Sequence, residues 1–255
     1  MTHSLFDLTG RVALITGSSR GIGYALAQGL AESGSTVVLN GSQPAGVDQA
    51  VETLAAAGHA VSGRAFDVLD PAAVREGVAG IESEIGPIDI LINNAGIQRR
   101  VPLLECTEET WQEVIDTNLS SVFRVGREVA RGMVARGRGK IINICSLQSE
   151  LGRYSIAPYA ASKGGVRMLT RNMCAEWAQH NVQVNGIGPG YFKTELTHAL
   201  VDDEAFSDWL CARTPANRWG EVSELQGAAI YLASRASDYV NGQILYVDGG
   251  LSAVV

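Results

Sequence analysis

Residues 11–23 read RVALITGSSRGIG, an aliphatic run that passes directly into a turn containing three glycines. The run at 11–16 predicts a short buried strand, because aliphatic and β-branched side chains fill its centre. Ile22, Leu26 and Leu30 then recur at helical spacing, so a helix is predicted to begin within the glycine turn. Strand, glycine-rich turn and helix in this order are typical of the first unit of an open α/β sheet.

The alternation of strand and helix continues along the rest of the chain. Near-continuous apolar strands separated by helices predict a seven-stranded parallel sheet with helices on both faces. A TIM barrel has a similar length and alternation, but the glycine turn and the strand count favour the open, doubly wound sheet. No linker interrupts the pattern, so we expect one domain over 1–255, with 190–220 as a substrate-binding insertion within it. Further strands are predicted at 35–40, 60–66, 88–92, 140–145, 182–187 and 242–247, and helices after Pro44, from 70 to about 85, at 107–135, at 158–179, within 194–213 and at 222–233.

Charge and composition exclude several classes of protein. The 255 residues carry a formal net charge of -7, whereas nucleic acids and membrane surfaces select a basic footprint, so we expect neither as a partner. The four cysteines form no CxxC pair and have no histidine at metal-ligand spacing, so we expect reduced thiols and no metal. With no targeting segment and no long apolar run, we expect a cytoplasmic protein.

One tyrosine and one of the three lysines have the spacing that brings two side chains together on a helix. Tyr159 and Lys163 are four residues apart, which places the phenol and the ammonium on the same face of the predicted helix. Ser146 follows the strand predicted at 140–145. Ligands of open α/β sheets bind outside the carboxyl ends of the strands, so we expect Ser146, Tyr159 and the glycine turn to face one crevice.

The motifs together resemble the short-chain dehydrogenase/reductase family over essentially the whole chain. The resemblance implies a single Rossmann-type domain, a nicotinamide cofactor, a homotetramer, and a catalytic tetrad of Asn118, Ser146, Tyr159 and Lys163. The matching elements, in family order and spacing, are TGSSRGIG (16–23), Asp67, NNAG (93–96), Asn118, Ser146, YAASK (159–163) and PGYFKT (189–194).

Physical chemistry supports the implied roles. A tyrosine ordinarily titrates near pH 10, so a nearby cation such as Lys163 is needed to stabilise its phenolate near neutrality. Tyr159 would then exchange the proton of the substrate hydroxyl, while Ser146 would hydrogen-bond the substrate oxygen. By resemblance, Asn118 holds a water that relays protons to Lys163.

The end of the second predicted strand bears on the choice of cofactor. It reads LNGS at 39–42 and lacks the acidic residue that would bind the adenosine ribose diol and repel a 2′-phosphate, so we expect NADP, with NAD possible. Arg20, Asn40 and Ser42 are available to hold that phosphate. The residues expected to bind the cofactor are Gly17, Ser19, Arg20, Gly21, Ile22, Gly23, Asn40, Ser42, Asp67, Val68, Asn94, Ala95, Gly96, Tyr159, Lys163, Pro189, Gly190 and Thr194.

Paired arginines after the fourth predicted strand indicate an anionic substrate. Arg99 and Arg100 could hold a carboxylate bidentately, and Arg100 is the preferred ligand. Ser146 and Tyr159 complete the expected substrate contacts, with Gln148 as a hydroxyl contact. NNAGIQRR (93–100), ICSLQSE (144–150), RTPANRWG (213–220) and VNGQILYVDGG (240–250) resemble the gluconate 5-dehydrogenase subgroup, whose reaction interconverts D-gluconate and 5-dehydro-D-gluconate.

The sequence also allows two other kinds of function. The tetrad also suits another sugar-acid oxidoreductase, such as a 2-deoxy-D-gluconate 3-dehydrogenase, or a 3-oxoacyl carrier reductase, although the paired arginines disfavour the acyl substrate. The same fold could also serve a non-catalytic nucleotide-binding regulatory protein, since fold does not fix function. Retention of Ser146, Tyr159 and Lys163 together argues against that alternative.

Overall fold

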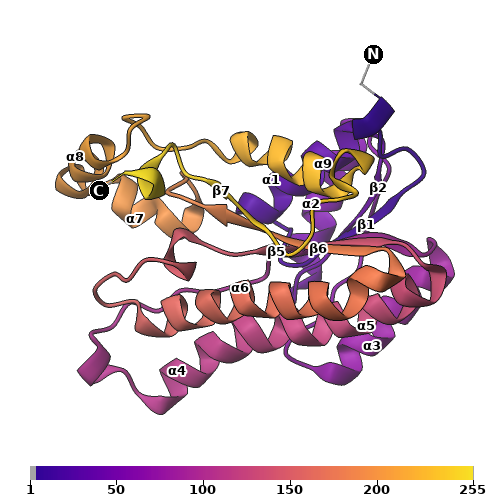
Figure 1. Ribbon diagram of the computed structural model, residues 1–255, viewed down its shortest axis with the longest axis horizontal. Coiled ribbons are helices and arrows are strands. Elements are labelled where there is room, and N and C mark those ends of the chain that lie inside the picture. Colours follow the sequence, from indigo (N-terminus) through magenta and orange to yellow (C-terminus); the bar gives the residue numbers. More distant parts are fainter. Residues whose placement is uncertain (1–3, 255) are drawn as a thin grey trace.

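Seven parallel strands form one sheet in the order β3-β2-β1-β4-β5-β6-β7 in the computed structural model, which describes residues 4–254 (Figure 1). The predicted fold class, strand count and parallel direction are therefore confirmed. The open sheet also excludes the TIM barrel that the alternation alone allowed. The strands are β1 (Val12–Ile15), β2 (Thr36–Leu39), β3 (Val61–Gly63), β4 (Ile88–Asn93), β5 (Gly139–Ile144), β6 (Val182–Pro189) and β7 (Ile244–Val247).

Helices cover both faces of the sheet, and each face has its own apolar core. Ala13 and Ile15 of β1 point into a core shared with α1, α2 and α9, whereas Val12 and Leu14 point into a core shared with α3, α5 and α6. Figure 1 shows these two sets of helices on opposite sides of the sheet, with α7 and α8 beyond one end of it. The helices are α1 (Gly21–Glu32), α2 (Pro44–Ala56), α3 (Pro71–Glu84), α4 (Glu108–Ile115), α5 (Ser121–Arg136), α6 (Ala157–Trp177), α7 (His198–Val201), α8 (Glu204–Arg213) and α9 (Gln226–Ala233).

Two elements differ from the sequence-based expectation. The long helix expected at 107–135 is present, but its two α-helical parts, α4 and α5, are joined without a gap by an unexpected π-helical turn at Asp116–Ser120. The strand expected at 60–66 is limited to β3, because the chain then leaves the ladder to contact the end of β2. Both departures occur where the backbone approaches the crevice described below.

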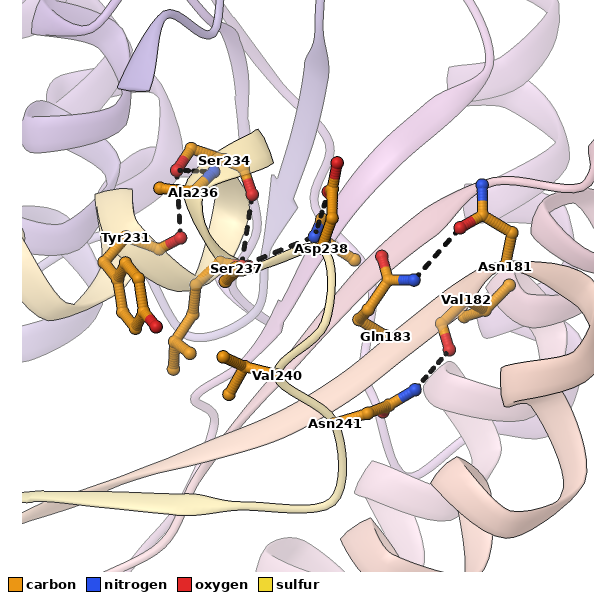
Figure 2. Close-up of polar contacts among 12 residues, drawn as sticks. Asn181, Val182, Gln183, Tyr231, Ser234, Ala236, Ser237, Asp238, Val240 and Asn241 are labelled. Atoms are coloured by element: carbon orange, nitrogen blue, oxygen red, sulfur yellow. Dashed lines mark hydrogen bonds and ion pairs between the residues drawn. The ribbon is translucent and has the colours of Figure 1, made fainter. Parts of the chain in front are cut away.

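The last strand, β7, pairs with β6 in a parallel ladder, and an asparagine just before β7 extends this pairing toward the start of β6. Asn241, in the loop before β7, accepts a hydrogen bond from the Val184 backbone N–H at 2.7 Å and donates its amide to the Val182 carbonyl at 3.2 Å. Figure 2 shows Asn241 reaching Val182 at the start of β6, with the turn at 234–238 nearby. These contacts join the loop before β7 to the start of β6 at the edge of the sheet.

The strand order reverses between β1 and β4, because β2 and β3 lie to one side and β5 to β7 to the other. In a parallel sheet this is the point at which the connecting loops diverge and leave a crevice at the carboxyl ends of the strands. The glycine turn at 16–23 and the NNAG segment at 93–96 leave β1 and β4 at this point. Across residues 4–254, the helices are all too short or too polar to cross a membrane.

Candidate active site

The glycine turn has the backbone conformation that its sequence predicts. Gly17 and Gly21 have positive φ angles of 60° and 58°, a region that residues with a Cβ atom rarely adopt. A Cβ atom on Gly17 would lie 2.8 Å from the Ala95 Cα, and one on Gly23 would lie 2.5 Å from the Gly17 carbonyl oxygen. The turn therefore requires glycine for both its dihedral angles and its close packing.

The first turn of α1 is suited to bind an anion. Its N-cap residue, Arg20, makes no side-chain capping hydrogen bond, so no side chain of the cap satisfies the first N–H groups of the helix. Gly21, Ile22 and Gly23 line the adjacent cavity. Free N–H groups and the positive end of the helix dipole together favour a phosphate group at this position.

Side chains lock the glycine turn to the end of β4. The Thr16 hydroxyl accepts hydrogen bonds from the backbone N–H groups of Asn94 and Ala95, at 3.0 and 3.1 Å. The Asn94 amide in turn donates to the carbonyls of Thr16 and Gly17, at 3.0 and 2.8 Å. The two loops on either side of the crevice thus form one connected unit.

A cavity of about 780 Å³ runs along this crevice, large enough for a dinucleotide. Sixteen of the eighteen residues expected to bind the cofactor line it. The remaining two, Pro189 and Gly190, lie outside the lining, where the Gly190 N–H donates to the Val247 carbonyl of β7. Residues that line the cavity without having been expected are Gly41, Gln43, Gly46, Phe66, Leu69, Ile97, Thr117, Ile144 and Glu195.

Tyr159 and Lys163 project from α6 into this cavity, and the Lys163 Nζ lies 5.8 Å from the centre of the Tyr159 ring. Lys163 is 5% exposed and donates to the Ile144 carbonyl at 2.6 Å. Burial lowers the pKa of Lys163 to about 8. Burial likewise raises the pKa of Tyr159, while hydrogen bonding with Ser146 acts in the opposite direction. The phenol is therefore protonated near neutrality and is positioned to donate a proton.

Ser146 is oriented by its neighbour Gln148. The Ser146 hydroxyl donates to the Gln148 side-chain oxygen at 2.6 Å and accepts from the Gln148 backbone N–H at 3.2 Å. Gln148 was expected to contact a substrate hydroxyl, but in this structure its amide oxygen is directed at Ser146. Ser146 is thereby held beside Tyr159 at the carboxyl end of β5.

Asn118 is fully buried at the π-helical turn, and its side chain is occupied by structural contacts. Its amide donates to the Ile97 carbonyl at 3.0 Å and the Ser162 hydroxyl at 3.1 Å, and its oxygen accepts from the Ile97 N–H at 2.8 Å. The side chain therefore connects the loop after β4 to α6. Short π-helical turns are frequent at functional sites, because they redirect backbone carbonyl groups.

Asn40 lines the cavity, but its amide does not point into it as a donor. Both N–H groups are used, since the amide donates to the carbonyls of Arg64 and Phe66, each at 3.1 Å. Ser42 is exposed at the same rim, and the exposed Arg20 guanidinium pairs with Glu195 at 3.1 Å. An exposed ion pair of this kind contributes little stability, so Arg20 can exchange Glu195 for another anion at small cost.

The two adjacent arginines have different surroundings. Arg99 forms a bidentate ion pair with Glu113 of α4, at 2.9 and 2.6 Å, so the structure does not present it to the crevice. Arg100 has no carboxylate within 4.0 Å among residues 4–254. Burial and the neighbouring Arg153 lower the pKa of Arg100, and the nearby Tyr191 acts in the opposite direction. Of the two arginines, Arg100 is therefore the one whose guanidinium is not paired with a carboxylate among residues 4–254.

Comparisons with known proteins agree with this geometry. Residues 11–205 match the family model described as short chain dehydrogenase. The chain is 57% identical over 253 residues to the gluconate 5-dehydrogenase of Gluconobacter oxydans (strain 621H), covering 99% of both chains. It is 54% identical to the 5-keto-D-gluconate 5-reductase of Escherichia coli (strain K12), covering 99% of this chain and 100% of that one.

A solved structure is equally similar. The gluconate 5-dehydrogenase from Burkholderia cenocepacia J2315, in complex with NADP and tartrate, superposes with a TM-score of 0.97. It is 57% identical in sequence, and the match covers 99% of each chain. The fold and the full length of the present chain are thus shared with proteins that bear this name.

Proposed function

This chain belongs to the short-chain dehydrogenase family, and from that premise we propose that it interconverts D-gluconate and 5-dehydro-D-gluconate with NADP as cofactor. The observation that carries the proposal is the placement of Tyr159 and Lys163 in a dinucleotide-sized cavity, in a chain 57% identical to a gluconate 5-dehydrogenase. This degree of similarity favours the activity over a 2-deoxy-D-gluconate 3-dehydrogenase, a 3-oxoacyl carrier reductase or a non-catalytic regulator.

The described residues fit a bound NADP. The uncapped first turn of α1 would hold the pyrophosphate. No acidic side chain is present from Asn40 to Gln43 to repel a 2′-phosphate, and the N-cap of α2, Gln43, also lacks a side-chain capping bond. Ser42 and Arg20 would contribute a hydroxyl and a guanidinium at the same rim. The NADP bound to the Burkholderia protein supports this choice.

The protein supplies the proton and the polar contacts for the reaction. When bound, the reduced nicotinamide supplies a hydride to the ketone carbon of the substrate. On substrate binding, Ser146 would exchange its hydrogen bond to Gln148 for one to the ketone oxygen. Tyr159 would transfer its phenolic proton to that oxygen as the alcohol forms. Lys163 stabilises the resulting phenolate. Asn118 holds the π-helical turn, whose backbone would position the water that returns a proton toward Lys163.

Arg100 is proposed to bind the carboxylate of the substrate. Its guanidinium lacks a carboxylate partner in the described chain, and a sugar acid would provide one. We further propose that the segment at 190–220, which carries α7 and α8, covers the substrate. Thr194 and Glu195 already reach the cavity from its first residues.

The enzyme is proposed to act as a cytoplasmic homotetramer. Phe123 of α5 and Met168 of α6 are large apolar side chains exposed on neighbouring helices, which supports burial of this surface between subunits. Light scattering is expected to give the mass of a tetramer, and the mass of a monomer would refute it.

A substrate panel tests the activity. The purified protein is expected to oxidise NADPH with 5-dehydro-D-gluconate and to reduce NADP with D-gluconate. It is expected to act poorly on 2-deoxy-D-gluconate and on an acetoacetyl thioester. Preference for either of those substrates would refute the proposal.

A further inference from the structure

Arg153 lies in the loop between Ser146 and α6, and it is held against an aromatic cluster of the 190–220 segment. Its guanidinium carbon lies 4.7 Å from the centre of the Phe206 ring and 5.6 Å from that of Tyr191. Its Nη1 donates to the Tyr191 hydroxyl at 2.7 Å. The two rings contact each other, with centres 5.7 Å apart, and Trp219 packs against both. Stacking and a hydrogen bond therefore fix the plane of the guanidinium.

The loop that carries Arg153 is tied to the loop that carries Arg100. The backbone N–H of Val101 donates to the Ser155 carbonyl at 2.9 Å, which places the two arginine-bearing segments side by side. Ser155 has a φ angle of 61°, which is uncommon for a residue other than glycine. Such strained conformations cluster at ligand-binding sites.

The two arginines form an unneutralised pair of positive charges. Burial lowers the pKa of Arg100, and the positive charge of Arg153 adds to this effect. No carboxylate lies within 4.0 Å of either guanidinium among residues 4–254, although ten other arginines do make such ion pairs. Two like charges kept together without a counter-ion are suited to bind an anion.

This pair also lies close to the reacting end of the site. The loop that carries Arg153 follows Ser146 directly along the chain and leads into α6, the helix that carries Tyr159. Tyr191, the hydrogen-bond partner of Arg153, lies two residues after the end of β6, next to the carboxyl end of β5 that presents Ser146.

We propose that Arg153 and Arg100 together bind the substrate carboxylate, with Tyr191 and Phe206 holding Arg153 in place. The inference rests on the proposed sugar-acid substrate and adds to it a second, stacked arginine that determines specificity for a carboxylate over a neutral sugar. In 5-dehydro-D-gluconate the carboxylate is remote from the ketone along the carbon chain. Two guanidinium groups can each donate to one carboxylate oxygen and so fix the distance from that end to Tyr159.

The test compares two ketones that differ only at the position of the carboxylate. L-Sorbose has the ketone and hydroxyl groups of 5-dehydro-D-gluconate, with a CH₂OH group in place of the carboxylate. Arg153→Met is expected to lower kcat/KM for 5-dehydro-D-gluconate roughly 10- to 100-fold, mainly through KM, and to change that for L-sorbose less than about twofold. Arg153→Lys should fall between, because an ammonium retains the charge but not the fork. The control is Arg75→Met, which removes an exposed arginine of α3 and should alter neither substrate.

Binding of D-gluconate to the NADP-loaded protein gives a second measurement, independent of turnover. Calorimetry is expected to show roughly 10- to 100-fold weaker binding by the Arg153→Met variant. An equal loss with both ketones, or unchanged binding of D-gluconate, would overturn the assignment. If the wild type binds D-gluconate but converts neither D-gluconate nor 5-dehydro-D-gluconate, the proposed function fails. The difference in D-gluconate binding between the wild type and Arg153→Met would still decide the role of Arg153. If the wild type binds no D-gluconate, the inference fails as well.

Discussion

Replacement of Asn40 by aspartate tests how the end of β2 is built. This position is where an acidic residue would favour NAD, yet Asn40 is 1% exposed and its amide donates to two backbone carbonyls, those of Arg64 and Phe66. An aspartate has the same shape but no N–H group. Asn40→Asp would therefore direct carboxylate oxygens at two carbonyl oxygens in a buried space.

The loss of stability expected from Asn40→Asp follows from the two hydrogen bonds that the Asn40 amide donates. Each of the two carbonyls left without its donor costs about 1–3 kcal/mol, so the free energy of unfolding should fall by about 2–6 kcal/mol at pH 7. Burial raises the pKa of the introduced carboxyl above its value of about 3.9 in the unfolded chain. The destabilisation must then grow as pH rises above about 4, because the folded state resists losing the proton. At lower pH the neutral acid can still donate one hydrogen bond.

Urea denaturation followed by circular dichroism at pH 5 and pH 7 measures this effect. Ser42→Asp is the matched control, since it adds the same carboxylate two residues later at an exposed position and should change stability by less than about 0.5 kcal/mol. If Asn40→Asp unfolds within about 1 kcal/mol of the wild type at pH 7, the amide does not hold the turn as described.

Three further predictions concern the site. Ser42→Asp should lower kcat/KM for NADPH relative to that for NADH by about tenfold or more, because the new carboxylate would repel the 2′-phosphate expected beside it. An unchanged ratio of the two kcat/KM values would mean that the 2′-phosphate binds elsewhere. For ketone reduction, kcat/KM should decline as pH rises above about 8, because Lys163 loses its charge there. A Lys163→Arg variant whose kcat/KM declines at the same pH would contradict this assignment. Asn118→Leu should lower the free energy of unfolding by about 2–4 kcal/mol, as measured in urea, because buried partners at Ile97 and Ser162 lose their hydrogen bonds. A loss of activity without a loss of stability would instead assign the Asn118 side chain to the chemistry.

The sequence predicts the sheet well because the central strands are buried on both faces and the helices repeat their apolar positions locally. It does not predict the π-helical turn at Asn118, which depends on bonds to Ile97 and Ser162 from other parts of the chain. The sequence placed Arg100 ahead of Arg99 as the carboxylate ligand, but it could not show their different surroundings, which arise when Glu113 pairs with Arg99.

Arg153 is another residue whose surroundings could not be predicted from the sequence. Its position carries no motif, and its hydrogen-bond partner Tyr191 lies 38 residues away in the sequence. By contrast, the glycine turn and the pair formed by Tyr159 and Lys163 are recognisable because their function depends on local spacing. Contacts between segments distant in the chain, such as that of Arg153 with Tyr191, form only when the chain folds.

The most direct test of the account is the reduction of 5-dehydro-D-gluconate by NADPH, with the product identified by NMR. The wild type is expected to consume NADPH and form D-gluconate, whereas Tyr159→Phe should lose about 100-fold or more of the turnover and still bind NADPH. Absence of wild-type turnover, full activity of the Tyr159→Phe variant, or formation of the C5 epimer L-idonate would contradict the account.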